Sequence, residues 1–129
     1  MSRCVVAILG ALALALVAVP ASAGPLRFER LSETRFTVEH NSWAASGEIS
    51  DYRGALQRAA SICRAAGYEY VEILGRSRTP SSYSTAVEFT VHHESGEGRV
   101  NCAAQANAKQ FDQAKKKLAE MDAKKKQKP

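Results

Sequence analysis

The sequence lacks the short motifs by which many enzymes and cofactor-binding proteins are recognised. It contains no Cys-x-x-Cys pair, no His-x-x-x-His spacing, no Gly-x-Ser-x-Gly elbow and no Gly-Lys-Ser/Thr phosphate loop. These absences argue against a thioredoxin-type redox centre, a helical zinc site, an α/β-hydrolase and a P-loop nucleotide-binding protein. We therefore expect no catalytic residues, no cofactor and no bound metal, and a protein that is not an enzyme.

Lysine is absent before residue 109, so the basic charge is confined to the C-terminus. Residues 24–108 contain nine arginines and ten acidic residues, a net charge of −1, whereas residues 109–129 contain eight lysines and three acids, a net charge of +5. A lysine cluster can bind anionic lipid or cell-wall polymer, or it can remain solvated at a helix end, where cations are favourable. The arginines of the Arg76–Arg78 segment could also hold anions. We expect no nucleic acid as a partner.

The N-terminus has the features of a cleavable secretory signal peptide, residues 1–23. Arg3 gives a positive start, Val5 to Val19 is apolar apart from one glycine, and Ala21-Ser22-Ala23 is a small-x-small cleavage site before Gly24. An uncleaved membrane anchor is the alternative, but about fifteen apolar residues are fewer than the roughly twenty that a spanning helix needs. The sequence thus predicts a periplasmic or secreted protein, with cleavage between Ala23 and Gly24.

Cleavage removes Cys4 and leaves two cysteines, Cys63 and Cys102. An even number of cysteines in an oxidising compartment predicts a disulfide, with two buried thiols as the alternative. The expected hairpin between them also brings the two segments together. Such a bridge would contribute roughly 3–5 kcal/mol in the chain-entropy model. Their wide separation in sequence favours a structural bridge over a redox-active pair.

The centre of the chain reads as one amphipathic helix followed directly by one strand. Residues at helical spacing predict an apolar stripe, comprising Ile49, Tyr52, Leu56, Ala59, Cys63 and Ala66. Ser50 or Asp51 could cap the start, and Gly67 can end the helix in a left-handed conformation. From Tyr68 to Leu74 the period changes to two, which is typical of a strand.

The remaining segments complete an α+β domain. We expect an arm at 24–34, a strand at 35–41, a polar turn at 75–82, a strand at 83–93, a turn at 94–98, and at 99–103 a short strand or the start of the last helix. The last helix has an apolar stripe of Ala104, Ala108, Phe111, Ala114, Leu118 and Met121, and its lysine-rich end should fray. The predicted fold is a small antiparallel sheet of three to four strands, packed by one long helix, with a C-terminal helix (β-α-β-β-(β)-α). The predicted domain covers 24–108, and 109–129 forms the lysine-rich helix and tail.

The order of three segments resembles a family of small, uncharacterised bacterial envelope proteins, many of them lipoproteins. The segments are Phe36-Thr37-Val38, then Ala55-Leu56-x-Arg58-Ala59-Ala60, then Gly67-Tyr68. The resemblance covers about residues 30–95 and implies an envelope location and an α+β fold, with no activity to transfer. Members often carry a cysteine directly after the leader; this chain has Gly24 there, so we expect no lipid anchor.

Three histidines are the only candidate metal ligands of note. His40 ends the first expected strand, and His92 and His93 end the third. If those strands are neighbours, His40 could meet one of the pair, with Glu39 or Glu94 as a further ligand. We therefore predict an exported envelope protein of unknown role, a non-enzymatic binding or structural module whose partner is an unknown protein or an envelope surface. The alternative is a small-molecule or transition-metal binding protein that uses the strand-end histidines.

Overall fold

The structure is a computed structural model that describes residues 26–41, 48–79, 81 and 84–127. The predicted signal peptide and the predicted cleavage site at Ala23 and Gly24 lie outside the described residues. The elements are β1 (Arg27–Arg30), β2 (Arg35–Asn41), α2 (Glu48–Ala65), β3 (Tyr70–Thr79), β4 (Ser84–His92), β5 (Arg99–Asn101), α3 (Cys102–Gln105) and α4 (Ala108–Gln127). Within these residues, no helix combines the length and apolar character needed to cross a membrane.

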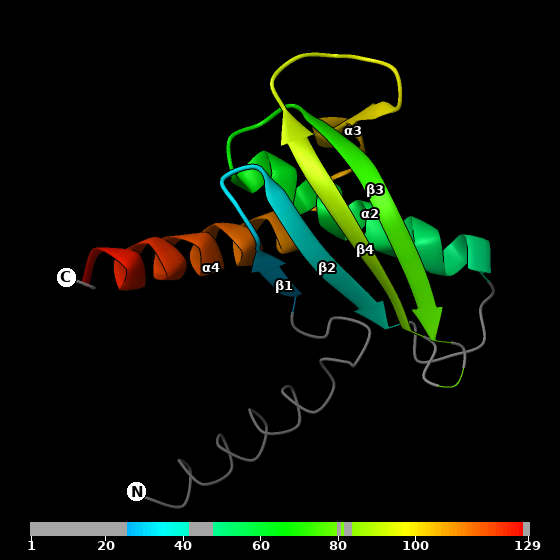
Figure 1. Ribbon diagram of the computed structural model, residues 1–129, viewed down its shortest axis with the longest axis horizontal. Coiled ribbons are helices and arrows are strands. Elements are labelled where there is room, and N and C mark those ends of the chain that lie inside the picture. The colour runs from blue at the N-terminus through cyan, green and yellow to red at the C-terminus, as the bar shows by residue number, and fades with distance from the viewer. Residues whose placement is uncertain (1–25, 42–47, 80, 82–83, 128–129) are drawn as a thin grey trace, which may run out of the picture.

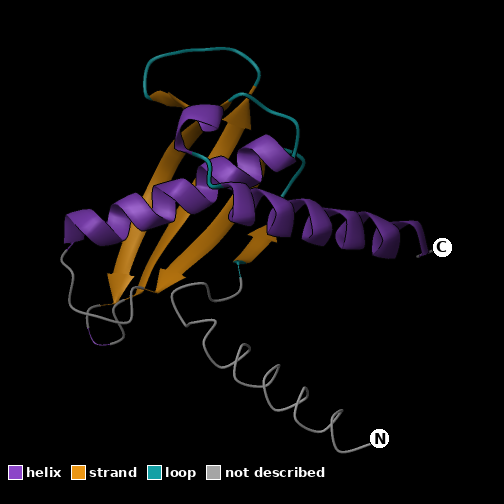
Figure 2. Ribbon diagram, turned by 180° about the vertical axis from the view of Figure 1, so that it is seen from behind, coloured by secondary structure: helices purple, strands orange, loops and turns teal. Residues whose placement is uncertain are grey.

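The strands form one antiparallel sheet in the order β1-β2-β4-β3-β5. Both long helices, α2 and α4, lie on the same face of this sheet, and the described part of the chain leaves the other face uncovered (Figures 1 and 2). The predicted α+β class with a C-terminal helix is confirmed. The sheet has five strands rather than three to four, because a strand forms where the sequence indicated only an arm.

That additional strand is β1, which pairs with β2 so that Phe28 lies opposite Val38 and Arg30 opposite Phe36. Phe28 is 4% exposed and its ring lies 6.2 Å from the ring of Phe36. Four residues with one large apolar side chain are too few for alternation to be recognised. The strand forms because that side chain extends the core.

The core lies between the sheet and the two helices. Apolar side chains of β2, β3 and β4 pack against small residues of α2 and against the first half of α4; they include Phe36, Val38, Val71, Val87, Phe89, Val91, Ala55, Ala59, Ile62, Ala114 and Leu118. The rings of Phe36 and Phe89 stack at 5.4 Å across the β2–β4 pair. Alanines along α2 let its backbone lie close to the sheet, as expected from the composition of the helix.

The buried face of α2 differs from the predicted stripe. Ile49 is 76% exposed, whereas Arg58 and Ser61, which lie outside that stripe, are 7% and 0% exposed. Ser61 is buried because its hydroxyl donates to the Gln57 carbonyl and accepts from the Asn107 amide at 2.9 Å. The stripe is wrong at Ile49 because Asp51 is the residue of the first turn that faces the sheet, and Ile49 lies about 200° away from it around the helix.

Of the two structures that the sequence left open at 99–103, the short strand forms, and a separate short helix follows it in place of the start of the last helix. Residues Arg99–Asn101 form β5, and Asn101 then caps α3, its side-chain oxygen accepting from the Ala104 amide at 3.1 Å. Ala104 therefore belongs to α3 and not to the final helix. The helix α4 continues to Gln127, further than the predicted fraying allowed.

Cys63 in α2 and Cys102 at the start of α3 form the predicted disulfide. Their Cα atoms lie 6.2 Å apart, and both residues are 0% exposed. The Tyr68 amide, just past Gly67, donates to the Cys63 carbonyl, and the Cys102 amide donates to the Glu69 carbonyl at 2.9 Å. One end of the sheet thus joins the end of α2, the start of β3 and the end of β5. The predicted hairpin brings the two cysteines to this same end.

Candidate functional site

The helix-facing side of the sheet changes from apolar to polar toward the end of β2. Phe36, Phe89 and Ile73 lie in one cross-strand row; two residues further along β2, Val38 lies opposite Val87. The last row on this side consists of His40, Thr85 and Arg78, with Thr85 opposite both of the others. Three polar side chains therefore lie side by side between the sheet and the N-terminal half of α2.

A bulge in β3 determines that arginines face the helix. The pairing with β4 shifts between Ile73 and Gly75, so that Arg76 lies opposite Val87 and Arg78 opposite Thr85. An extra residue in one strand reverses the alternation beyond it. The predicted turn at 75–82 was wrong for this reason. The strand continues to Thr79, with its arginines on the α2 side and Ser77 on the uncovered side.

Asp51 is the buried acid of this region, at 0% exposure. Its Oδ2 atom accepts from Arg78 Nε at 3.1 Å and from Arg78 Nη2 at 2.9 Å. The helix already begins at Glu48, so Asp51 lies inside the first turns and is not the cap that the sequence indicated. This ion pair joins α2 to β3, and breaking a buried pair is costly because one charge stays buried alone.

His40 lies on the other side of the row and accepts a hydrogen bond at Nδ1 from Arg58 Nε, at 3.0 Å. Burial lowers the pKa of His40, the charge of Arg58 lowers it further, and Asp51 opposes the effect. The hydrogen bond requires an unprotonated Nδ1, so the ring is neutral with its proton on Nε2. Burial also lowers the pKa of Arg58, although a guanidinium keeps its charge.

The ring of His40 packs directly on Gly54 of α2. A Cβ atom added at Gly54 would lie 2.4 Å from His40 Nε2 and 2.6 Å from His40 Cε1. Glycine is therefore required here for space. With Nδ1 bonded to Arg58 and Nε2 against the helix, His40 has no free nitrogen directed at a substrate. The polar cluster His40, Asp51, Arg58, Arg78 and Thr85 thus positions α2 on the sheet.

Thr85, at the centre of the row, is 3% exposed. Among the described residues its Oγ1 is the buried side-chain polar atom that has no hydrogen-bond partner. An unpaired buried hydroxyl costs stability. Thr85 therefore fills the space between His40 and Arg78 without joining their bonds.

The other two histidines lie far from His40. Because β2 and β4 are antiparallel neighbours, the end of β2 meets the beginning of β4, and the span from Thr85 to His92 covers roughly 23 Å at about 3.3 Å per residue. His92 is on the uncovered face with Nε2 2.8 Å from Glu72, and His93 stacks on Tyr68 at 4.4 Å. The structure does not bring His40 together with either of them.

Metal ligands do not gather elsewhere in the described ranges either. No group of three His, Cys, Asp or Glu side chains is arranged there to hold an ion. Glu72, which could have joined His92, lies 3.9 Å from Arg99 Nε. The acidic residues named with the histidines in the sequence, Glu39 and Glu94, do not complete a site: Glu39 lies opposite Ala86, and Glu94 accepts from Arg99 through its backbone carbonyl.

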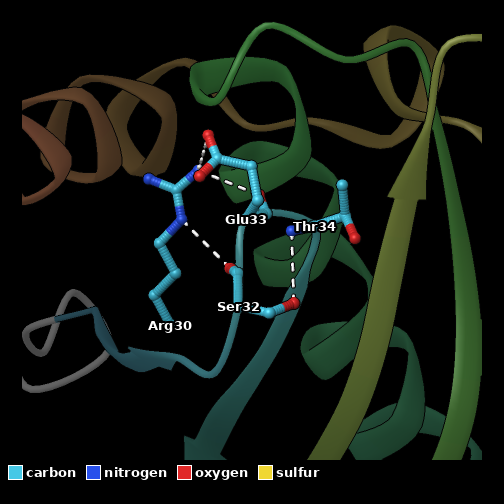
Figure 3. Close-up of polar contacts among 4 residues, drawn as sticks. All are labelled: Arg30, Ser32, Glu33 and Thr34. Carbon is cyan, nitrogen blue, oxygen red and sulfur yellow. Dashed lines mark hydrogen bonds and ion pairs between the residues drawn. The ribbon is translucent and has the colours of Figure 1, made fainter.

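A groove of about 790 Å³ lies between the β1–β2 turn and the C-terminal halves of α2 and α4. Its lining combines apolar side chains with charges of both signs: Phe28, Ala65, Ala66, Leu118, Met121, Glu29, Arg30, Glu33, Asp122 and Lys125. Figure 3 shows that Arg30 bends back onto its own turn, where it donates to the Ser32 carbonyl at 3.2 Å and the Glu33 carbonyl at 2.9 Å. In the same turn the Thr34 amide lies 3.4 Å from Ser32 Oγ. The volume of this groove suits a small molecule, but its lining carries both acidic and basic side chains and therefore favours neither an anionic nor a cationic ligand.

The lysines of α4 have different environments. Lys117 donates to the Phe28 carbonyl at 2.8 Å and lies 4.6 Å from the Phe28 ring, so it fastens α4 to β1. Lys124, Lys125 and Lys126 are exposed in the last turn, on the part of α4 that extends beyond the sheet in Figures 1 and 2. The lysine-rich segment is therefore partly an internal support and partly a free basic surface.

The outer edge of β3 is the most open backbone in the described sheet. β5 pairs only with Tyr70–Glu72, and in the described ranges no strand pairs with the far side of residues 73–78. Leu74, in the bulge, is 47% exposed. The sequence pattern does not predict this edge, because the strand alternation ends at Leu74. A bulge leaves no periodic signal from which the continuation could be recognised.

Comparison with known proteins does not supply a function for any of these features. No family model, no curated protein and no solved structure matches this chain. The function has to be inferred from the geometry of the molecule itself.

Proposed function

We propose that this protein is an exported component of the cell envelope that acts as a non-enzymatic binding module, with the uncovered side of its sheet as the binding surface. One observation carries the proposal: both long helices lie on one face of the sheet, and the described part of the chain covers neither the opposite face nor the edge of β3 at residues 73–78. A sheet that keeps one face and one edge open offers backbone and side-chain contacts to a partner.

The state of the reactive side chains supports a role without catalysis. His40 is held between Arg58 and Gly54, His92 is paired with Glu72, and the two cysteines of the mature chain are joined to each other. A general base or nucleophile needs access to substrate. The disulfide favours an oxidising compartment, in agreement with the leader and with the envelope family that the sequence resembles.

Export is tested by the intact mass of the protein recovered from its native compartment, before and after reduction with thiol alkylation. We expect a chain that begins at Gly24 and is alkylated only after reduction. A chain that keeps Met1 and has free thiols would refute an exported protein.

Binding through the open side is tested by placing a photo-crosslinking residue at Leu74, with Leu31 as the matched control. Both leucines are exposed, at 47% and 51%, but Leu31 follows β1 at the other edge of the sheet. A crosslinked envelope partner at position 74 and none at position 31 is the expected result. Equal crosslinking at both positions, or none at position 74, would contradict a binding surface on this side.

A second candidate partner is an anionic surface, through the exposed lysines 124–126. Each lysine near such a surface contributes about 1 kcal/mol. We expect the chain to sediment with vesicles that contain anionic lipid and to lose this binding when residues 122–129 are deleted. Unchanged binding after the deletion would rule out the lysine-rich end as the contact. The strand-end histidines lie too far apart to form a common site, so the metal-binding alternative has no geometric support.

A further inference from the structure

The edge of β3 offers a position for one additional strand. Residues 73–78 pair with β4 on one side, and the described chain places no strand on their other side. Backbone groups along such an edge can pair with an incoming chain, and proteins usually limit this with short edges, charges or bulges. The described sheet ends on its other side in β1, a four-residue strand, so the longest open edge is that of β3.

The first turns of α2 lie under the position that an additional strand would occupy beside β3. In Figures 1 and 2 the N-terminal end of α2 extends past β3, on the side away from β4. Arg76 lies 4.5 Å from the ring of Tyr52, which places these turns beside the edge. An added strand would thus have α2 under one of its faces.

The charges at the edge select the kind of strand that fits. Arg76 is exposed, while Arg78 already holds Asp51. A second copy of this protein would place its own β3 arginines beside these, and like charges on adjacent strands are destabilising. A segment with carboxylates toward α2 and apolar side chains toward Leu74 would complement the edge.

We propose that the edge of β3 and the first turns of α2 bind an extended acidic segment of a partner protein, which joins the sheet as an additional strand. Its main chain pairs with residues 73–78, its carboxylates meet Arg76, and alternate apolar side chains cover Leu74. This inference rests on the proposed binding function and specifies the partner chemistry of the same surface.

The test uses two labelled peptides, acetyl-(Val-Glu)₄-amide and acetyl-(Val-Lys)₄-amide, and the purified protein, with binding measured by fluorescence anisotropy at low and at physiological salt. We expect the acidic peptide to bind and the basic peptide not to bind. Arg76→Glu should weaken binding of the acidic peptide at least tenfold and allow the basic peptide to bind. Lys116→Glu, an equal charge change on the exposed surface of α4, should alter binding less than twofold.

Amide hydrogen exchange, measured by NMR at peptide saturation, distinguishes strand addition from a contact between side chains. We expect alternate amides within residues 73–78 to exchange at least tenfold more slowly. Absence of binding, equal effects of Arg76→Glu and Lys116→Glu, or binding without slower exchange would each overturn the proposal. Protection of these amides that grows with protein concentration alone would identify a second copy as the occupant and would also overturn it. A crosslink at position 74 combined with failure here would leave the binding function standing with a different partner.

Discussion

Gly54 is the position at which packing and helix propensity make opposite predictions. Alanine is normally about 1 kcal/mol better than glycine inside a helix, so on propensity alone Gly54→Ala should stabilise α2. The structure predicts the reverse, because the new Cβ would lie 2.4 Å from Nε2 of the His40 ring. The ring cannot retreat without loss, since its Nδ1 accepts from the buried Arg58 at 3.0 Å.

The expected size follows from those contacts. Overpacking costs about 1–3 kcal/mol, and a lost hydrogen bond to a charged group costs about 1.5–3 kcal/mol, against about 1 kcal/mol of propensity gained. We expect Gly54→Ala to lower the free energy of unfolding by about 2–4 kcal/mol. In a His40→Ala background the obstacle is absent, so the same change should raise the free energy of unfolding by about 1 kcal/mol.

The assay is urea unfolding followed by far-ultraviolet circular dichroism on the four proteins of this double-mutant cycle. Gly67→Ala is the control: Gly67 has φ +91°, and an added Cβ meets no atom within 4 Å. It should therefore cost about 1–2 kcal/mol in either background, through backbone strain alone. If Gly54→Ala stabilises the protein while His40 is present, the packing of His40 on α2 is wrong.

Three further perturbations test the polar cluster and the crosslink. The pKa of His40 is below its usual value of 6.5 in the folded protein, so below that pH the unfolded chain binds more protons than the folded chain. The free energy of unfolding should therefore be highest above pH 6.5 and should fall as the pH decreases through the folded pKa. In urea unfolding at several pH values, His40→Gln should reduce this slope. Asp51→Ala should lower the free energy of unfolding by about 3 kcal/mol. This value is in the lower part of the range for a broken buried ion pair, because the Arg78 side chain is 28% exposed. A loss below about 1 kcal/mol, which is typical of a surface pair, would refute the buried role of the Asp51–Arg78 pair. Replacing Cys63 and Cys102 with alanine should cost about 4 kcal/mol by urea unfolding, and a reductant should reach the intact bridge only under unfolding conditions because both residues are 0% exposed; rapid reduction of the folded protein would contradict that burial.

Periodic patterns predicted the elements that are long and half-buried. The strand at 35–41 and the helix ending before Gly67 were predicted within a residue or two, and the strand expected at 83–93 is β4 at Ser84–His92. Each of these segments has enough apolar residues at helix spacing or at strand spacing to exclude the other type of element. The disulfide was predicted from two features: the oxidising compartment that the leader indicates, and the expected hairpin that brings Cys63 and Cys102 together.

The candidate site could not be predicted in the same way, because it depends on contacts between distant segments. Asp51 and Arg78 are ordinary surface residue types, and only the bulge in β3 directs Arg78 toward α2. The histidine hypothesis assumed that neighbouring strands bring their ends together, which holds for parallel strands, whereas β2 and β4 are antiparallel. Strand direction and register are properties of the assembled sheet, so they are absent from any local pattern.

The disulfide also determines how the molecule would carry tension. It closes a covalent loop over a sequence separation of 39, and this loop contains β3, β4 and β5. A pull on the two ends of the chain passes from α2 through the sulfur atoms to α3 and α4, and it cannot draw out the segment between them. The extensible length is shorter by roughly 130 Å at about 3.4 Å per residue. Because β3, β4 and β5 lie inside this loop, they stay out of the load path while a pull draws out the segments on either side of it.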